Sequence, residues 1–340
     1  MIYPDNFEQK IGFNEIRNML RERCLSTLGK EQVEKMAFSD DAEQVNEWLK
    51  QVREFRRLIL EVEDFPLQYF YDVRESIVRI RIENTHLEEN ELFDLRRSLS
   101  TIDCIVKILN HSDEDESHAE ENDGWRREKK YTYPSLHLLA KDIVTFPQIV
   151  QRIDQILDKF GKIRDNATPE LLQIRRELAK TEGSISRTLY SILRSAQSEG
   201  VVEKDVTPTL RDGRLVIPVI PTLKKKIKGI VHDESATGKT VFIEPTEVVE
   251  ANNRVRELEG EERKEIIRIL TQFTNKLRPY TREIMDSYRF LAKIDLIQAK
   301  QKLAEIQKAI EPEVEDHPHI DWIRAVSYTH LRAHETRHDL

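Results

Sequence analysis

Two long stretches of the chain repeat their apolar residues at the spacing of an amphipathic helix. Between Thr168 and Ala196 these positions are Leu171, Ile174, Leu178, Ile185, Leu189, Ile192 and Ala196. Thr168 is a favourable N-cap, and Pro169 suits the first helical position. A second stripe follows Pro245 and contains Val248, Val255, Leu258, Ile266, Ile269, Phe273 and Leu277. The spacing predicts two antiparallel helices, each about 45 Å long at about 1.5 Å per residue.

Between these helices, residues 206–245 change to a strand pattern. The apolar or β-branched runs are Val206–Leu210, Leu215–Val219, Ile227–His232 and Thr240–Glu244. The dipeptide Asp212-Gly213 separates the first two runs and favours a two-residue type I′ hairpin. Pro218 and Pro221 cannot donate to a ladder, which indicates that the second strand lies at a sheet edge. We therefore expect a small four-stranded sheet at the tip of a long helical arm.

The rest of the chain also carries helical spacing. Asp40 with Glu43 and Thr85 with Glu88 have the spacing of capping boxes, and Pro312 would end the last helix. The expected fold is mainly α, a helical core plus a long antiparallel lever with a β clamp inserted. Its parts are a helical core over 1–167, an outgoing lever helix over 168–205, a β clamp tip over 206–245, a returning lever helix over 246–280 and a core-closing helix over 281–325.

Two segments are set apart from this core. Residues 112–123 carry seven acids, and Arg126–Lys130 reverses the sign, so we expect 112–130 to be a solvated, mobile insert. Residues 326–340 resemble translated adapter sequence and are expected to add nothing to the fold. This tail contains His334-Glu335-Thr336-Arg337-His338, the H-E-x-x-H pattern of zinc peptidases, but no third ligand follows it. We therefore predict no metal site.

Composition and charge exclude several classes of protein to which this chain could belong. The chain is 39% hydrophobic and 34% charged, a balance that suits elongated helices better than one thick core. Its net charge of −8 excludes a general polyanion binder, so any contact with nucleic acid must be local. Cys24 and Cys104 are too few for a disulfide framework, which indicates the reducing cytoplasm. With no apolar run of membrane length, we expect no membrane partner.

Three patterns that could indicate catalysis are better explained otherwise. Gly238-Lys239-Thr240 resembles the end of a phosphate-binding loop, but Asp233 occupies the first glycine position and a strand pattern follows. A turn that needs Gly238 is the better interpretation. His232 and Ser235 lack a third partner for nucleophilic catalysis, and carboxylate groups such as Glu257 to Glu262 have the spacing of a helix surface. No catalytic residue is predicted.

A cluster of cations on the predicted tip is the main candidate for function. Residues 211–232 hold six Lys or Arg side chains against one acid, a local balance of +5. Such side chains can neutralise phosphates without reading bases, although lysines also protect strand edges from pairing. The two interpretations are compatible. The candidate nucleic-acid-binding residues are Arg211, Arg214, Lys224, Lys225, Lys226, Lys228, His232 and Lys239.

Several segments of the tip resemble one known family. Arg211–Arg214, Lys228–Ala236 and Phe242–Pro245, with Asn252 and Asn253, resemble the lever and clamp of the bacterial MutS type II family, and the likeness extends over about residues 1–325. Asp165–Leu171 and the opening Phe7–Leu20 also resemble that family's core. The resemblance implies a homodimer that closes around DNA or the ribosome, including its RNA, in suppression of recombination and rescue of stalled ribosomes.

The resemblance also implies parts that we expect to lie beyond this chain. In the family, an ATPase that uses ATP and Mg²⁺ and an Smr endonuclease domain follow towards the C-terminus. Because no complete Walker motif occurs here, we expect an N-terminal, non-catalytic fragment that needs no cofactor itself. The mismatch-reading domain of repair MutS is also not expected. The alternative is a structural coiled-coil protein whose β tip binds other proteins.

Overall fold

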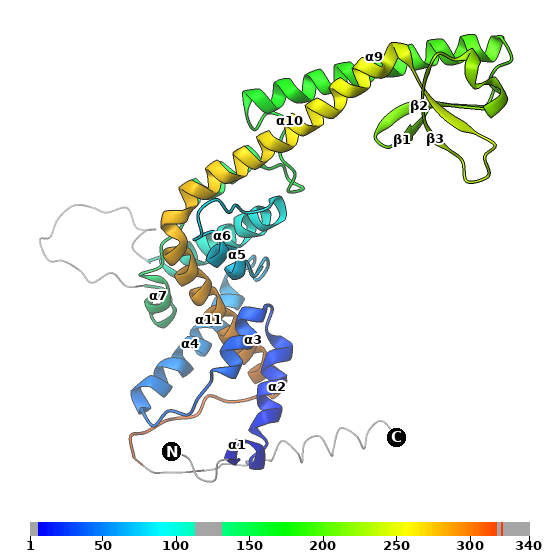
Figure 1. The fold of residues 1–340 in the computed structure, drawn as a ribbon. Helices are drawn as coiled ribbons and strands as arrows, with labels where there is room; N and C mark the ends of the chain where they lie inside the picture. The colour runs from blue at the N-terminus through cyan, green and yellow to red at the C-terminus, as the bar shows by residue number, and fades with distance from the viewer. Residues whose placement is uncertain (1–5, 113–130, 318–320, 322–340) are drawn as a thin grey trace, which may run out of the picture. The chain divides into compact units, whose positions relative to one another are not determined.

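The computed structural model describes residues 6–112, 131–317 and 321 (Figure 1). Of the insert predicted over 112–130, residues 113–130 lie outside these residues, and so does the tail with His334 and His338. The fold is mainly α with one four-stranded antiparallel sheet, as predicted. The chain divides into two compact units, residues 1–68, 105–143 and 289–340, and residues 69–104 and 144–288. No described helix is long and apolar enough to cross a membrane.

The first unit is built from helices of 4 to 20 residues and from parts of two longer ones. They are α1 (Phe7–Lys10), α2 (Phe13–Arg23), α3 (Thr27–Glu34), α4 (Ala42–Glu61) and α7 (Pro134–Ala140), with the adjoining ends of α6 (Glu89–Leu109) and α11 (Thr281–Ile306). Asp295 of α11 accepts hydrogen bonds from the backbone N–H groups of Leu25 and Ser26, at 2.8 and 2.9 Å, and so fixes the start of α3. Gly29 packs so closely on Asp295 that a Cβ would clash.

The predicted cap of α4 is one residue too early. Asp41 is the N-cap, and its carboxylate accepts from the backbone N–H of Gln44 at 3.1 Å. Asp40 with Glu43 has the same spacing in sequence, so the pattern alone could not separate the two registers.

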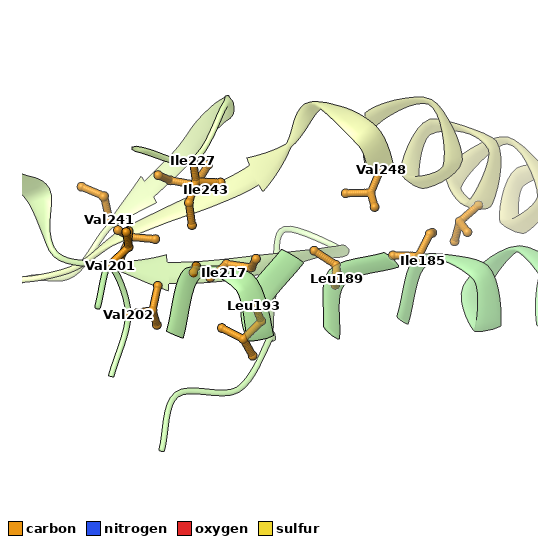
Figure 2. Packing of buried hydrophobic residues seen from close by; sticks show 13 residues of the cluster. Ile185, Leu189, Leu193, Val201, Val202, Ile217, Ile227, Val241, Ile243 and Val248 are labelled. Atoms are coloured by element: carbon orange, nitrogen blue, oxygen red, sulfur yellow. The ribbon is translucent and has the colours of Figure 1, made fainter. Parts of the chain in front are cut away.

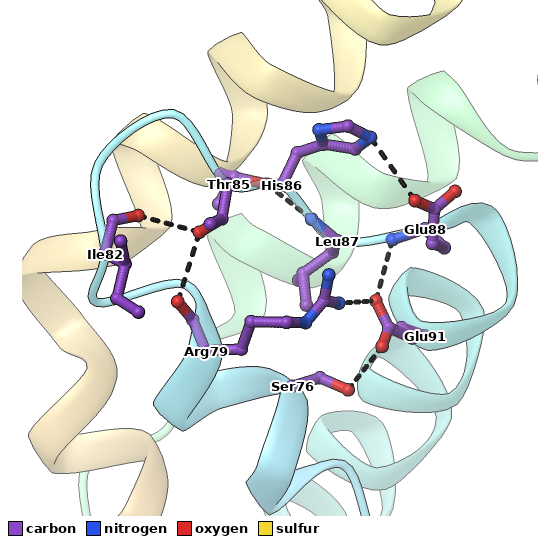
Figure 3. Close-up of polar contacts among 9 residues, drawn as sticks. Ser76, Arg79, Ile82, Thr85, His86, Leu87, Glu88 and Glu91 are labelled. Atoms are coloured by element: carbon purple, nitrogen blue, oxygen red, sulfur yellow. Dashed lines mark hydrogen bonds and ion pairs between the residues drawn. The ribbon is translucent and has the colours of Figure 1, made fainter.

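Polar contacts join α5 (Arg74–Arg79) to the start of α6 in the second unit (Figure 3). Glu91 accepts from the backbone N–H of Glu88 at 2.8 Å and from Ser76 Oγ at 2.6 Å. The predicted cap Thr85 was wrong, because its hydroxyl instead lies within hydrogen-bond distance of carbonyls at the end of α5 and just beyond it. Leu87 N–H donates to Thr274 Oγ1 at 3.1 Å, which ties this joint to α10.

The helical arm consists of α9 (Pro169–Ser198) and α10 (Thr246–Leu277), which lie side by side and antiparallel (Figure 1). The predicted N-cap Thr168 is confirmed, since its hydroxyl accepts from Leu171 N–H at 3.1 Å. Polar pairs mark the opposite directions of the helices. Thr168 bonds to Glu265, Arg175 to Glu262 and Glu177 to Arg254. After α10, the short 3₁₀ helix η3 (Arg278–Tyr280) leads directly into α11.

The sheet contains β1 (Thr209–Arg211), β2 (Arg214–Val219), β3 (Gly229–Glu234) and β4 (Val241–Pro245), in the order β1-β2-β4-β3. Asp212 and Gly213 have φ values of 49° and 73°, as the predicted type I′ hairpin requires. The prediction that β2 is an edge strand was wrong, because β2 lies between β1 and β4. β1 pairs only with residues 214–216 and β4 with 217–219, so Pro218 has a neighbouring strand on one side only.

One apolar cluster joins the sheet to the end of the arm (Figure 2). α9 contributes Ile185, Leu189 and Leu193, the sheet contributes Ile217, Val241 and Ile243, and α10 contributes Val248. All are at most 2% exposed, so the sheet shares its core with both helices of the arm. Burial of this shared surface holds the sheet on the two helices.

Candidate nucleic-acid interface

Four of the candidate lysines lie together on the connection between β2 and β3. Lys224, Lys225 and Lys226 are on the 3₁₀ helix η2 (Pro221–Lys226), and Lys228 follows it. All four side chains are exposed. Within the described part of the chain they form no ion pair or side-chain hydrogen bond. Their ammonium groups therefore face solvent with their charge uncompensated.

Lys239 is exposed in the turn between β3 and β4. Ser235 N–H donates to the Thr240 carbonyl at 2.8 Å, and Gly238 N–H donates to the Ser235 carbonyl at 2.7 Å. Gly238 has a φ of 65°, which a glycine adopts at little cost. The prediction of a turn at Gly238-Lys239-Thr240 is confirmed, and strand β4 follows it where a phosphate-binding loop needs a helix.

Arg211 at the end of β1 presents its guanidinium across the sheet. The group lies over the ring of Phe242, 4.3 Å from the ring centroid, and 4.0 Å from a carboxylate oxygen of Asp233. Its side chain is 48% exposed. The ring therefore positions this cation while leaving much of it open to a ligand.

Arg214 and His232 occupy a different environment. Arg214 Nη1 lies 2.7 and 2.8 Å from the carboxylate oxygens of Glu244, and Arg214 Nη2 donates to Asn253 Oδ1 at 2.6 Å. His232 Nε2 and Asn252 Nδ2 also bond to that carboxylate. These contacts place the two predicted cations inside the tip, where they join the sheet to α10.

Glu244 is completely buried. Burial raises the pKa of its carboxyl, but hydrogen bonds from Asn252, His232 and Arg214 outweigh burial and lower the pKa below its ordinary value. Sequence reasoning missed Glu244 as the anchor of the tip. The available signal was a carboxylate within the apolar run Val241–Pro245, where an unpaired charge would be costly.

Gly229 is the first residue of β3, and its backbone lies close to the backbone of Glu244. A Cβ at this position would clash with the carbonyl oxygen of Glu244. The Thr246 N–H donates to the Lys228 carbonyl at 3.1 Å, which continues the pairing beyond the strand. The backbone at Lys228 is therefore fixed, although its side chain is exposed.

The candidate cations thus fall into two sets. The outward cations, a name kept below for the exposed set, are Arg211, Lys224, Lys225, Lys226, Lys228 and Lys239. The inward cations are Arg214 and His232. Only the outward set can approach a large polyanion without dismantling the contacts of Glu244.

The amino-acid sequence is similar to that of known proteins over most of its length. No family model matches the sequence. Endonuclease MutS2 of Geobacillus sp. strain WCH70 is 33% identical over 313 residues, which cover 92% of this chain and 38% of that protein. Endonuclease MutS2 of Levilactobacillus brevis is 34% identical over 304 residues, or 89% of this chain and 36% of that protein.

The curated relatives are therefore much longer than the matched region, and the chain spans little more than a third of their length. The resemblance to the MutS type II family that the sequence motifs indicated is confirmed. The chain is homologous to the bacterial MutS2 proteins over about nine tenths of its own length.

Proposed function

We propose that this chain is the non-catalytic clamp and lever part of a MutS2 protein and holds the phosphate backbone of DNA or ribosomal RNA. The observation that supports the proposal is the set of outward cations on and beside the sheet. The ammonium groups of its five lysines have no ion-pair or hydrogen-bond partner among the described residues, whereas Arg211 lies 4.0 Å from Asp233 and keeps a side chain that is 48% exposed. Phosphate contacts of this kind give affinity and orientation without sequence selection. The contact residues would be Arg211, Lys224, Lys225, Lys226, Lys228 and Lys239.

The inward cations would serve the same function indirectly. Arg214 and His232 join strands to α10 through Glu244, and the apolar cluster joins the sheet to α9. A ligand at the tip would therefore act on both helices of the arm. In the intact protein we propose a cytoplasmic homodimer whose ATPase, with ATP and Mg²⁺, and Smr endonuclease lie elsewhere. Its roles would be suppression of recombination and rescue of stalled ribosomes.

The test compares two variants of equal charge. In the tip variant, Lys224, Lys225 and Lys226 are each replaced by Glu; in the control, the exposed Lys50, Lys141 and Lys276 are replaced by Glu. Binding to a fluorescein-labelled DNA duplex is measured by anisotropy, and binding to ribosomes by cosedimentation, from about 50 to about 200 mM salt. We expect the tip variant to lose affinity and to show a shallower salt dependence, because fewer counterions are released.

The control variant should bind nearly as well as the unmodified chain, because none of its three lysines belongs to the tip, residues 206–245. The proposal fails if the tip variant binds DNA and ribosomes with unchanged affinity and unchanged salt dependence. Equal losses in both variants would show that only the net charge matters.

A structural module that binds proteins is the second candidate. It is favoured by the edge strand β3, where Ile230 and Val231 are 48% and 45% exposed. An exposed apolar strand edge can pair with a strand of another protein. Such a contact would change little between low and physiological salt, so the same titration separates the two functions.

A further inference from the structure

We infer that a pocket in the body of the second unit binds a nucleoside phosphate, either free or as one unit of a single-stranded nucleic acid. The cavity has a volume of about 620 Å³, and none of its lining residues belongs to the tip. Cavities of this size accommodate small ligands. The lining residues that carry the inference are Tyr69, Phe93, Arg96, Arg97, Lys159 and Arg164.

Arg97 is the first element of this site. Its guanidinium lies 4.5 Å from the ring centroid of Tyr69, 4.3 Å from that of Tyr71 and 5.0 Å from that of Phe93. A carboxylate oxygen of Asp94 forms an ion pair with it at 3.7 Å, which is longer than a hydrogen bond. Among the described residues this guanidinium makes no hydrogen bond. Aromatic rings thus hold the cation in place while its N–H groups stay available to an anion.

Tyr69 supplies an aromatic face at the rim of the cavity. Its ring is stacked on that of Tyr71, and the residue is 44% exposed. Its φ of 62° is unfavourable for a bulky side chain, and the Ser98 hydroxyl lies within hydrogen-bond distance of the Tyr69 and Tyr71 carbonyls. Backbone strain of this kind persists where surrounding contacts impose it, often at functional sites.

The loop after α8 (Pro147–Ile156) contributes other lining residues of the cavity, among them Asp158 and Lys159. Asp158 accepts from the N–H groups of Phe160 and Lys162 at 2.8 and 2.9 Å, so its carboxylate is engaged by backbone. Gly161 has a φ of 79°, and a Cβ there would lie 2.9 Å from Phe93 Cγ. The loop therefore packs tightly on α6. It leaves Phe160 74% exposed with the Lys159 ammonium over its ring.

The charges of the pocket select an anionic ligand. Arg96 is paired with Asp154 at 2.8 Å, and Arg164 Nε donates to backbone carbonyls. The carboxylates of Asp154 and Asp158 are engaged by these contacts. Lys159 forms no ion pair among the described residues, and Arg97 forms only the 3.7 Å ion pair with Asp94. A phosphate fits these two cations. A flat base fits the exposed ring of Tyr69, because bases stack on aromatic side chains with little dependence on sequence.

The experiment uses the full chain with Lys224, Lys225 and Lys226 replaced by Glu, so that the tip contributes little. AMP binding is measured by calorimetry, and binding of fluorescein-labelled oligothymidylate by anisotropy. Arg97→Gln removes the cation, while Tyr69→Gly removes the ring at a backbone angle that glycine adopts freely. We expect each change to weaken binding by about tenfold or more.

Arg152→Gln is the matched control, since Arg152 lies on the same helix as Asp154 but bonds to Gln155 at 2.7 Å and does not line the cavity. Weakening of AMP binding by both pocket variants, but not by the control, supports a site for free nucleotides. The same pattern with oligothymidylate alone supports a site for a nucleic-acid strand. The inference is overturned if neither probe binds, if the pocket variants bind normally, or if inorganic phosphate binds as tightly as AMP.

Because these measurements use the tip variant, their failure would leave the proposed function of the outward cations unaffected. Circular dichroism on each variant confirms that the helices are retained. If a pocket variant unfolds, Arg97→Lys is used in its place. This substitution keeps the positive charge but removes the planar group that stacks on the rings, so it should still weaken binding.

Discussion

Arg214 Nη1 lies 2.7 and 2.8 Å from the two carboxylate oxygens of Glu244, and the side chain of Glu244 is 0% exposed. The same carboxylate bonds to His232 and Asn252, so one buried group links β2, β3 and β4 to α10. The stability of the tip should therefore depend on it.

Glu244→Gln should destabilise the tip by about 3 kcal/mol, because it leaves the Arg214 guanidinium, 13% exposed, without a countercharge. Hydrogen exchange of the amides in β4 measures this change locally. Asp233→Asn is the control, since Asp233 is 47% exposed and 4.0 Å from Arg211, and it should cost less than about 1 kcal/mol. Equal losses in the two variants would refute a special role for Glu244.

Acid should weaken the same contact. The pKa of Glu244 lies below its ordinary value of 4.5 in the folded state, although burial alone would raise it. The folded state therefore binds fewer protons than the unfolded state, so the stabilisation is present above pH 4.5 and is lost as the pH falls through the folded pKa.

Amide protection in β4, followed from about pH 6 to about pH 3, should fall in the unmodified chain as Glu244 becomes protonated. The groups that face this carboxylate are the Arg214 guanidinium, the His232 imidazole and the Asn252 amide. In Glu244→Gln the part of the decline due to Glu244 should be missing, whereas other carboxylates titrate in both proteins. If the unmodified chain and Glu244→Gln gave identical pH profiles, protonation of Glu244 would not be a cause of the decline.

Replacement of glycine by alanine should have opposite effects on stability at two positions. Gly229→Ala places a Cβ against the Glu244 backbone and should cost about 2 kcal/mol or more. Gly183 lies within α9 with open space around it, so Gly183→Ala should stabilise the arm by about 0.5 to 1 kcal/mol. Urea unfolding followed by circular dichroism measures whether each substitution lowers or raises the free energy of unfolding. Destabilisation by Gly183→Ala would show that α9 is not a regular helix there.

The pair of Arg175 and Glu262 should contribute measurably to the pairing of α9 with α10. Their nitrogen and oxygen atoms are 2.7 Å apart, and each side chain is 24% exposed. A double-mutant cycle with Arg175→Ala and Glu262→Ala should give a coupling energy of about 0.5 to 1 kcal/mol. The 76%-exposed Asp165 should couple to Arg175 more weakly in a parallel cycle. A coupling near zero for Glu262 would mean that this ion pair does not help to hold the two helices together.

The sequence was informative where a local rule dominates. Asp212-Gly213 predicts its hairpin because both positions need positive φ, and Thr168-Pro169 predicts the start of α9 because capping is local. The approximate positions of the four strands followed in the same way from residue type and turn signals.

Long-range relationships could not be predicted in this way. The strand order places β4 between β2 and β3, which depends on how η2 crosses the sheet and not on any local pattern. Arg214 is 30 residues from Glu244 in sequence, and His232 is 12 residues from it. For that reason a charge count placed both among the phosphate-binding candidates, whereas the structure shows their contacts inside the tip.

The direct succession of α10, η3 and α11 has a mechanical consequence. From Thr246 to Ile306 the backbone is helical throughout, and Asn252 attaches its first turns to the carboxylate of Glu244. If the lysines of the tip bind a phosphate backbone as proposed, a force on that ligand would be transmitted along α10, which is one continuous helix from Thr246 to Leu277 without an intervening loop.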